Sequence, residues 1–108
     1  MAMQDLTHPK HYAVGGVYVK ELFLENVGDG VVSHSHHHDH LSLVARGKVR
    51  VTADGVVTDY PERSAVNIKA GVKHEIVALE ANTLWYCLHA VPPELQGEDM
   101  LDAYVSAD

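Results

Sequence analysis

Histidine is the residue type with the clearest chemical potential in this chain. Nine of the 108 residues are histidine, at positions 8, 11, 34, 36, 37, 38, 40, 74 and 89. Five of these nine fall between His34 and His40. Imidazole is the commonest metal-binding side chain near neutral pH, because its pKa leaves the ring largely neutral there. The cluster therefore predicts a site for a transition-metal ion.

The spacing of the histidines indicates which of them share a face. In an extended strand, residues i and i+2 point to the same side, so His34 and His36 project together. Two neighbouring histidines supply half of a metal site, and the other ligands must come from elsewhere in the chain. His74 is a candidate because it follows Gly71 by three residues at the start of another expected strand, where a turn can direct it inward.

Two other interpretations of the histidine cluster, a purification tag and a surface loop, must be weighed against a metal site. A purification tag is a terminal, uninterrupted run, whereas Ser35 and Asp39 interrupt this internal one. A His-rich surface loop can also collect metal without any function, by composition alone. We favour that interpretation for His37 and His38. His8 and His11 are expected to lie in an N-terminal arm with no chemical role.

Short strands are the elements that must position these histidines. The dominant hydrophobic period is two, which is typical of half-buried strands. Besides the segment around His34 and His36, strands are expected over residues 16–27, 41–45, 48–53, 56–60, 64–68, 74–79 and 83–91. Asp54-Gly55 is the preferred pair for a type I′ hairpin turn. Pro92-Pro93 ends the last strand, because proline cannot donate to a β ladder.

This pattern predicts an all-β domain, a sandwich or barrel of about eight short antiparallel strands. At 108 residues the chain is long enough for one hydrophobic core. We expect an N-terminal arm over residues 1–13, a barrel over residues 14–91 and a C-terminal extension over residues 92–108. Residues 94–105 form the one plausible helix.

Composition argues against several classes of protein. The formal net charge of −7 disfavours a nucleic-acid surface, which needs clustered Lys and Arg. No stretch approaches the roughly 18–20 apolar residues that a membrane span requires. The first ten residues lack the basic head and apolar run of a signal peptide, so a cytoplasmic location is expected. Cys87 is the lone cysteine, which rules out an intramolecular disulfide.

The last strand carries a further candidate for the site. Alternation groups Trp85, Cys87 and His89 on one face. If that face lines the barrel, His89 approaches the metal as the hydrogen-bonding partner of a ligand or as a proton carrier. The alternative is a buried structural histidine beside an inert buried cysteine. Glu75 points away from His74 and is expected at the surface rather than as a general base.

The first histidine cluster also matches the spacing of a known motif. Gly28 is followed by five residues and then by His34 and His36. Three residues later comes His40, and six residues after that comes Gly47. These are the spacings of the first cupin motif, in which His40 stands at the position of a glutamate.

A second, weaker match lies around His74. Gly71 and His74 stand at the glycine and histidine positions of the second cupin motif. Lys69 stands where that motif has proline, and Ala78 where it has asparagine. Over roughly residues 14–91 the chain therefore resembles a small single-domain cupin, with four histidines in place of three histidines and a glutamate.

The resemblance implies a fold and a ligand set. Cupins are small antiparallel β-barrels of jelly-roll type, also described as double-stranded β-helices, with the metal inside. The implied ligands are His34, His36, His40 and His74, around one divalent transition metal per chain. We expect Mn or Fe in the cell, and Zn or Ni in purified protein. With four neutral imidazoles the ion keeps a charge of +2, which makes it a stronger Lewis acid than a carboxylate-ligated ion.

The resemblance leaves three functions open. The first is a dioxygenase-like metal enzyme that acts on a small organic molecule. The second is a metal-dependent isomerase, epimerase or lyase that does not use O₂. The third is a non-enzymatic module that binds or senses a small molecule. Small cupins commonly dimerise, so we also expect a homodimer in which the apolar segment 14–24 contacts the partner.

Overall fold

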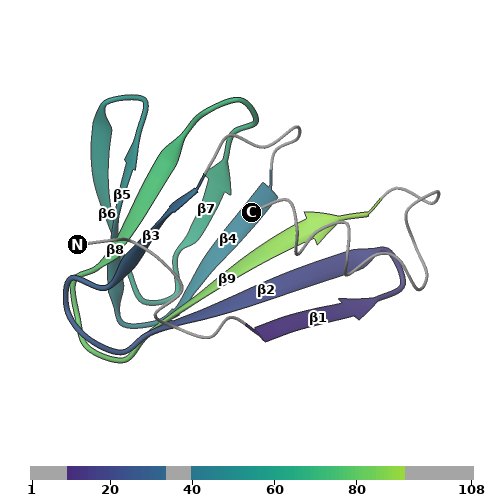
Figure 1. Ribbon diagram of the computed structural model, residues 1–108, viewed down its shortest axis with the longest axis horizontal. Helices are drawn as coiled ribbons and strands as arrows, with labels where there is room; N and C mark the ends of the chain where they lie inside the picture. The colour runs from purple at the N-terminus through teal and green to yellow at the C-terminus, as the bar shows by residue number, and fades with distance from the viewer. Residues whose placement is uncertain (1–9, 34–39, 92–108) are drawn as a thin grey trace.

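The computed structural model of the chain describes residues 10–33 and 40–91. Within this part all regular structure is antiparallel β-strand, in two sheets that face each other (Figure 1). Sheet A has the order β1-β2-β9-β4-β7, and sheet B has the order β3-β8-β5-β6. The strands are β1 (Lys10–Val14), β2 (Val17–Leu24), β3 (Gly30–Ser33), β4 (His40–Arg46), β5 (Lys48–Ala53), β6 (Val56–Pro61), β7 (Ala65–Ile68), β8 (His74–Ala78) and β9 (Thr83–Ala90).

The all-β prediction is confirmed, and most of the expected strands are found within one or two residues of their expected ends. The hairpin between β5 and β6 turns at Asp54 and Gly55, whose φ angles of 52° and 77° are the positive values that a type I′ turn requires. The expected helix over residues 94–105 lies outside the described residues. No helix that could cross a membrane occurs in residues 10–33 or 40–91.

Two strands differ from the expectation. β1 begins at Lys10 and pairs along its whole length with β2, so the expected arm boundary at residue 13 falls inside a strand. β3 begins at Gly30, directly after turn residues, and pairs with β8. Both strands are short, and no side chain of β1 is more than half-buried, so alternation gives little signal for them.

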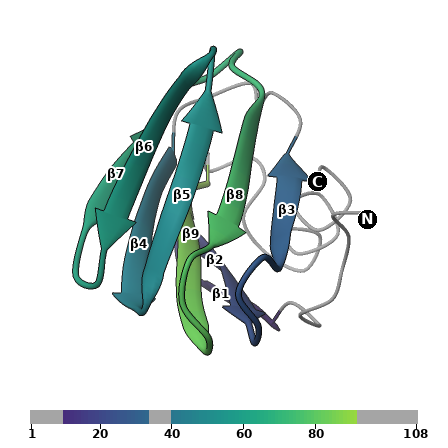
Figure 2. The same ribbon diagram turned by 90° about the vertical axis from the view of Figure 1, so that its left-hand side faces the viewer.

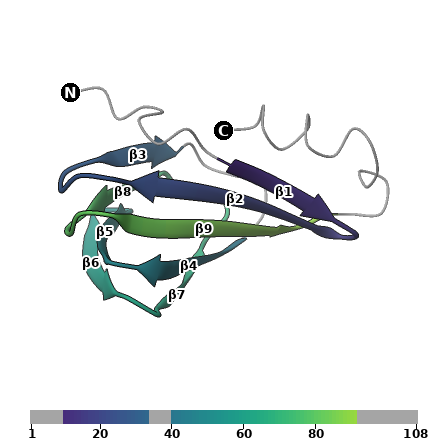
Figure 3. The same ribbon diagram turned by 90° about the horizontal axis from the view of Figure 1, so that it is seen from below.

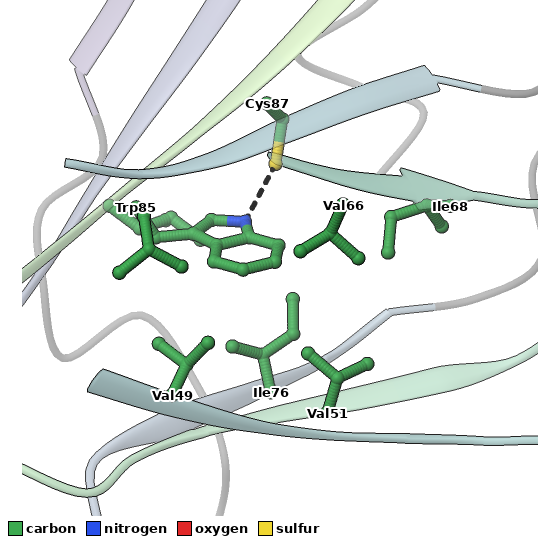
Figure 4. Close-up of a cluster of buried hydrophobic side chains, with 9 residues drawn as sticks. Val49, Val51, Val66, Ile68, Ile76, Trp85 and Cys87 are labelled. Atoms are coloured by element: carbon green, nitrogen blue, oxygen red, sulfur yellow. Dashed lines mark hydrogen bonds between the residues drawn. The ribbon is translucent and has the colours of Figure 1, made fainter. Parts of the chain in front are cut away.

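Alternating apolar residues build the core between the two sheets. Trp85 on β9 is fully buried and lies at the centre of the core (Figure 4). Val49, Val51 and Ile76 of sheet B face it from the opposite side, as expected for the parity of residues 48–53. The indole nitrogen of Trp85 donates to the sulfur of Cys87 at 3.1 Å. Cys87 is therefore a buried core residue, in agreement with the inert interpretation.

Gly47, the last glycine of the first motif, has a packing role. It forms the tight connection between β4 and β5 with a φ of 85°. A Cβ at this position would lie 2.9 Å from Cα of Thr83, which is closer than real carbon atoms approach. Because the backbone of β9 blocks the space, only glycine allows β4 and β5 to close around it.

Candidate metal centre

The interior between the sheets is polar at one end and apolar at the other. Along each of three strands, the inward-facing side chains change from histidine at one end of the interior to apolar residues towards the other. They are His40, Ser42 and Val44 on β4, His89, Cys87 and Trp85 on β9, and His74, Ile76 and Ala78 on β8. Because β4 and β9 are antiparallel, His40 at the start of β4 and His89 near the end of β9 lie at the same end of the interior. Three histidines are thereby buried together.

His40 and His74 face each other from opposite sheets. Their side chains are 5% and 3% exposed, and their ring centroids are 6.0 Å apart. With nitrogen–metal bonds of about 2.1 Å, two imidazoles that share one ion have centroids roughly 4.5–6.5 Å apart. The planes of the two rings are inclined by 52°, so they are not stacked. The pair therefore has the separation that a shared metal ion needs.

A backbone contact fixes the ring of His74. Its Nδ1 lies 3.2 Å from the carbonyl oxygen of Val72, which belongs to the turn before β8. A carbonyl can only accept, so Nδ1 carries the proton and the lone pair is on Nε2. Metal-binding histidines are commonly oriented by this kind of hydrogen bond from the nitrogen that does not bind the metal. The donor set present thus fits a metal.

The other two predicted ligands, His34 and His36, lie outside the described residues, as do His8, His37 and His38. The strand that precedes them in the sequence is β3, whose last residue Ser33 is the register partner of His74. Among residues 10–33 and 40–91, no three His, Cys, Asp or Glu side chains are arranged to hold a metal ion. The described part of the chain supplies one pair of the predicted ligand set.

The ring of His89 stacks on the ring of His40, so His89 is not placed to be a further ligand of the same ion. The two rings are stacked, with centroids 4.5 Å apart and planes inclined by 29°. The nitrogen lone pairs of an imidazole lie in the ring plane, so stacked rings do not converge on one ion. Trp85, Cys87 and His89 share one face of β9, as the alternation predicts, and the structure shows that this face is the inner one. Glu75 is exposed, also as expected.

Two residues that the sequence analysis did not assign to the site continue the contacts beyond His89: Tyr18 contacts His89, and His11 contacts Tyr18. Tyr18 is fully buried, and its ring centroid lies 5.5 Å from that of His89. His11, which was expected in an arm without a role, lies on β1 with its Nδ1 2.6 Å from the Tyr18 hydroxyl. Tyr18 shares its parity with the apolar Leu22 and Leu24, which is the one local signal that it points inward.

Cavities adjoin the histidine end of the interior. One of about 260 Å³ lies between the sheets, and His74 forms part of its wall. Most of its lining is apolar, with Val51, Val66, Ile68 and Val72 among the wall residues. A second, more open cavity of about 440 Å³ lies on another side of His74, where Asp54, Lys73 and Glu75 contribute. His74 is thus accessible to a small molecule from the cavities.

No protein-family model and no curated protein matches this chain. Solved structures do. KdgF from Halomonas sp. is 23% identical over 91% of this chain and 89% of its own, with a TM-score of 0.65. A protein of Bacillus halodurans is 18% identical over 88% of this chain and 76% of its own, with a TM-score of 0.69.

A cupin protein from Bacteroides fragilis is also similar to this chain. It is 19% identical over 92% of this chain and 91% of its own, with a TM-score of 0.61. At these identities the likeness concerns the fold. The chain has the cupin jelly-roll fold that the two motifs predicted.

Proposed function

We propose that this protein is a mononuclear metal-dependent enzyme of cupin type that acts on a small organic molecule. The proposed ligands are His34, His36, His40 and His74, with one divalent transition metal per chain. The observation that carries the proposal is the buried pair of His40 and His74, whose ring centroids are 6.0 Å apart and of which His74 lines a cavity. Burying two imidazoles is costly unless polar partners compensate, and a metal ion supplies such compensation.

The chain's own groups divide the work at this site. A bound ion would supply Lewis-acid polarisation or O₂ chemistry, with Mn or Fe favoured in the cell and Zn or Ni in purified protein. His74 is held with Nε2 as its binding nitrogen by the carbonyl of Val72. The apolar wall formed by Val51, Val66 and Ile68 keeps water away from the reacting groups.

The cavity limits the size and polarity of the substrate. A volume of about 260 Å³ lies just below the usual range of about 300–1,000 Å³ for ligand pockets. Its polar wall residues include Tyr60, Asn67 and Lys69, which can orient a hydroxyl, carbonyl or carboxylate group. A small molecule with an apolar body and one or two oxygen-bearing groups fits this lining.

The first test is metal content and O₂ consumption. Protein purified without a His-tag or nickel column is analysed for bound metal, loaded with Fe(II), and offered diketones, catechols and thiols. We expect one metal per chain and O₂ uptake with at least one substrate class. The variant His74→Ala should lose both, whereas Glu75→Gln, one residue away on the outer face, should keep both. Failure to bind any transition metal would overturn the proposal.

An O₂-independent reaction is the second candidate, favoured by the residue at position 40. A buried histidine stands there where the motif has glutamate, so the ion keeps a charge of +2. That charge strengthens a Lewis acid and disfavours an oxidised metal. Isomerase, epimerase or lyase activity that persists with Zn(II) and ignores O₂ would identify this class. Tight metabolite binding without turnover would instead make the protein a binding or sensor module.

We further propose that the protein is a homodimer, because the outer face of sheet A is apolar across four strands. The side chains on this face are Tyr12 and Val14 on β1, Val17, Val19 and Phe23 on β2, Leu84, Tyr86 and Leu88 on β9, and Leu41 and Leu43 on β4. Four strands at about 4.8 Å spacing and at most eight residues at about 3.3 Å outline up to roughly 500 Å². Side-chain relief adds to this outline, and a standard interface buries ~800 Å² per partner.

The carboxylate of Glu21 on this face is already hydrogen-bonded. The Tyr86 hydroxyl donates to Glu21 Oε2 at 2.6 Å, and Lys10 is the register partner of Glu21. This hydrogen bond raises the pKa of Tyr86 to about 12, so the phenol remains a donor at physiological pH. A face whose carboxylate is already hydrogen-bonded within the face is better suited to burial against a second copy than one with an unpartnered carboxylate.

Sedimentation at micromolar concentration tests the dimer. We expect a dimer for the wild type and a monomer for Leu88→Lys, which places a charge at the centre of the face. Val56→Lys is the matched control, since Val56 on β6 is 63% exposed and lies on the other sheet. A monomeric wild type would overturn this proposal and leave the metal proposal intact.

A further inference from the structure

A row of rings crosses the inner face of sheet A, from its β1 edge to His40. Figure 3 shows the four strands that carry these rings, β1, β2, β9 and β4, side by side in this order. Tyr18 and His89 are register partners on β2 and β9, with ring centroids 5.5 Å apart. The His89 ring continues the row to His40 at 4.5 Å. At the other end, His11 on β1 contacts Tyr18 through the 2.6 Å hydrogen bond. We call these four residues the ring row.

The inner part of the ring row is tightly enclosed. Tyr18 is fully buried, and His89 and His40 are each 5% exposed. On the far side of His40 its register partner is Ile68 on β7, which is also buried. Cross-strand neighbours on one face of a sheet are close enough to pack directly against each other. Each ring therefore restricts the rotation of the next, and His40 is held between His89 and Ile68.

His11 connects this row to an otherwise exposed strand. Of the five residues of β1, His11 is half-buried and the other four are exposed. Tyr18 carries a hydroxyl into a buried position, where such a group needs a hydrogen-bonding partner. The Nδ1 of His11 provides one at 2.6 Å. The position of the Tyr18 ring is thus tied to the pairing of β1 with β2.

We propose that His11 and Tyr18 are positioning residues of the metal site. Through His89 they hold the ring of His40 in the orientation in which it binds the metal. The inference rests on the proposed metal-binding function and extends it to an edge strand that contains none of the proposed ligands. Residues that orient a ligand histidine typically change metal affinity by about 10–100-fold when they are replaced.

The test uses Co(II) alone, added to the full chain, with two readouts. Calorimetry gives the dissociation constant, and visible absorption of bound Co(II) reports the geometry of its ligands. For Tyr18→Leu, which removes the ring, we expect about 10–100-fold weaker binding and shifted absorption bands. Tyr18→Phe keeps the ring but removes its hydrogen bond to His11, so it should lose about as much affinity as His11→Ala, about threefold to tenfold, and less than Tyr18→Leu. Tyr12→Leu, on the outer face of β1, is the matched control and should leave both readouts unchanged.

A second variant covers the case in which Tyr18→Leu does not fold. For His11→Ala, at the edge of the sheet, we expect a loss of affinity of about threefold to tenfold with a shift of the same bands. His11→Gln, which retains a hydrogen-bonding group, should recover most of the loss. Weaker binding with unchanged absorption would reflect lost stability alone and would overturn the inference.

The outcome also separates this inference from the proposed function. If the wild type binds Co(II) and a folded Tyr18→Leu or His11→Ala has the same affinity and absorption, the positioning role of that residue is overturned and metal binding stands. If the wild type itself does not bind Co(II), the proposed function fails, and the positioning role fails with it.

Discussion

The inward-facing rows of β4 and β8 run from histidine at one side of the sandwich to Val44 and Ala78 at the other. The row of β9 also begins at a histidine and reaches the second side through Trp85 and the buried Thr83. Each of these strands therefore contributes side chains to both ends. Two steps along its inward-facing side chains lead from the histidine to an apolar core residue. The apolar end holds the sheets together through a packed tryptophan (Figure 4). The histidine end holds the proposed metal site. In this fold the packed core and the proposed site are therefore separated along single strands rather than between domains.

The largest expected effect belongs to the apolar end. Trp85→Ala removes a fully buried indole, and we expect the metal-free protein to lose about 3–5 kcal/mol of unfolding free energy. Urea denaturation of the metal-free chain measures this loss. Such a loss approaches the whole stability of a small domain, so Trp85→Phe serves as a milder companion. A loss below about 1 kcal/mol would show that the core is not concentrated at this end.

Gly47→Ala, also at the apolar end, should cause the second-largest loss of unfolding free energy. The positive φ and the close approach to Thr83 together should cost about 2–4 kcal/mol. Gly55→Ala is the matched control, because Gly55 also has a positive φ but has open space where its Cβ would lie. Its smaller loss gives the cost of the φ angle alone. Equal losses for the two variants would mean that contact with β9 contributes nothing.

His74→Ala tests the other end. We expect the metal-free chain to lose about 1–2 kcal/mol, since one buried hydrogen bond disappears. Added metal should distinguish the two proteins more clearly. At a metal concentration of about 100 times Kd, the unfolding free energy of the wild type should rise by about 2.7 kcal/mol, whereas that of the variant should not change. Thermal unfolding with and without metal measures both. Equal stabilisation of the two proteins would remove His74 from the site.

Ser42→Ala has the smallest expected effect and locates the boundary between the two ends. The Ser42 hydroxyl is buried and has no hydrogen-bond partner among the residues that the structure describes. Removing it should change the unfolding free energy by less than about 0.5 kcal/mol, or raise it slightly. A loss above about 1 kcal/mol, measured by the same urea titration, would place Ser42 within a polar network of the histidine end.

Sequence alone was sufficient for much of this arrangement. Strict alternation on β9 grouped Trp85, Cys87 and His89 on one face, and the motif spacing selected His40 and His74. Both kinds of prediction succeeded for the same reason: strand alternation and motif spacing are local patterns that can be read along the chain. The sandwich topology also follows from the same motifs, since they imply a known fold.

The contribution of β1 could not be predicted from local pattern. His11 reaches the site only because β1 pairs with β2, and pairing between strands is a tertiary property that alternation does not encode. Tyr18 carried a weak signal through its parity with Leu22, but nothing in the sequence linked it to His89 on β9. Contacts across strands, rather than along them, are what the sequence analysis missed.

The walls of the smaller cavity have a consequence for how this protein can change. Val56, Thr58 and Tyr60 come from β6, and Val66 and Ile68 come from β7, the edge strands of sheets B and A (Figure 2). β6 is hydrogen-bonded only to β5 and not to β4 or β8, the strands that carry His40 and His74. Mutations on β6 can therefore alter the shape of the cavity while β4 and β8 keep these two histidines in place. The proposed substrate preference can in this way change without any change in the proposed metal ligands.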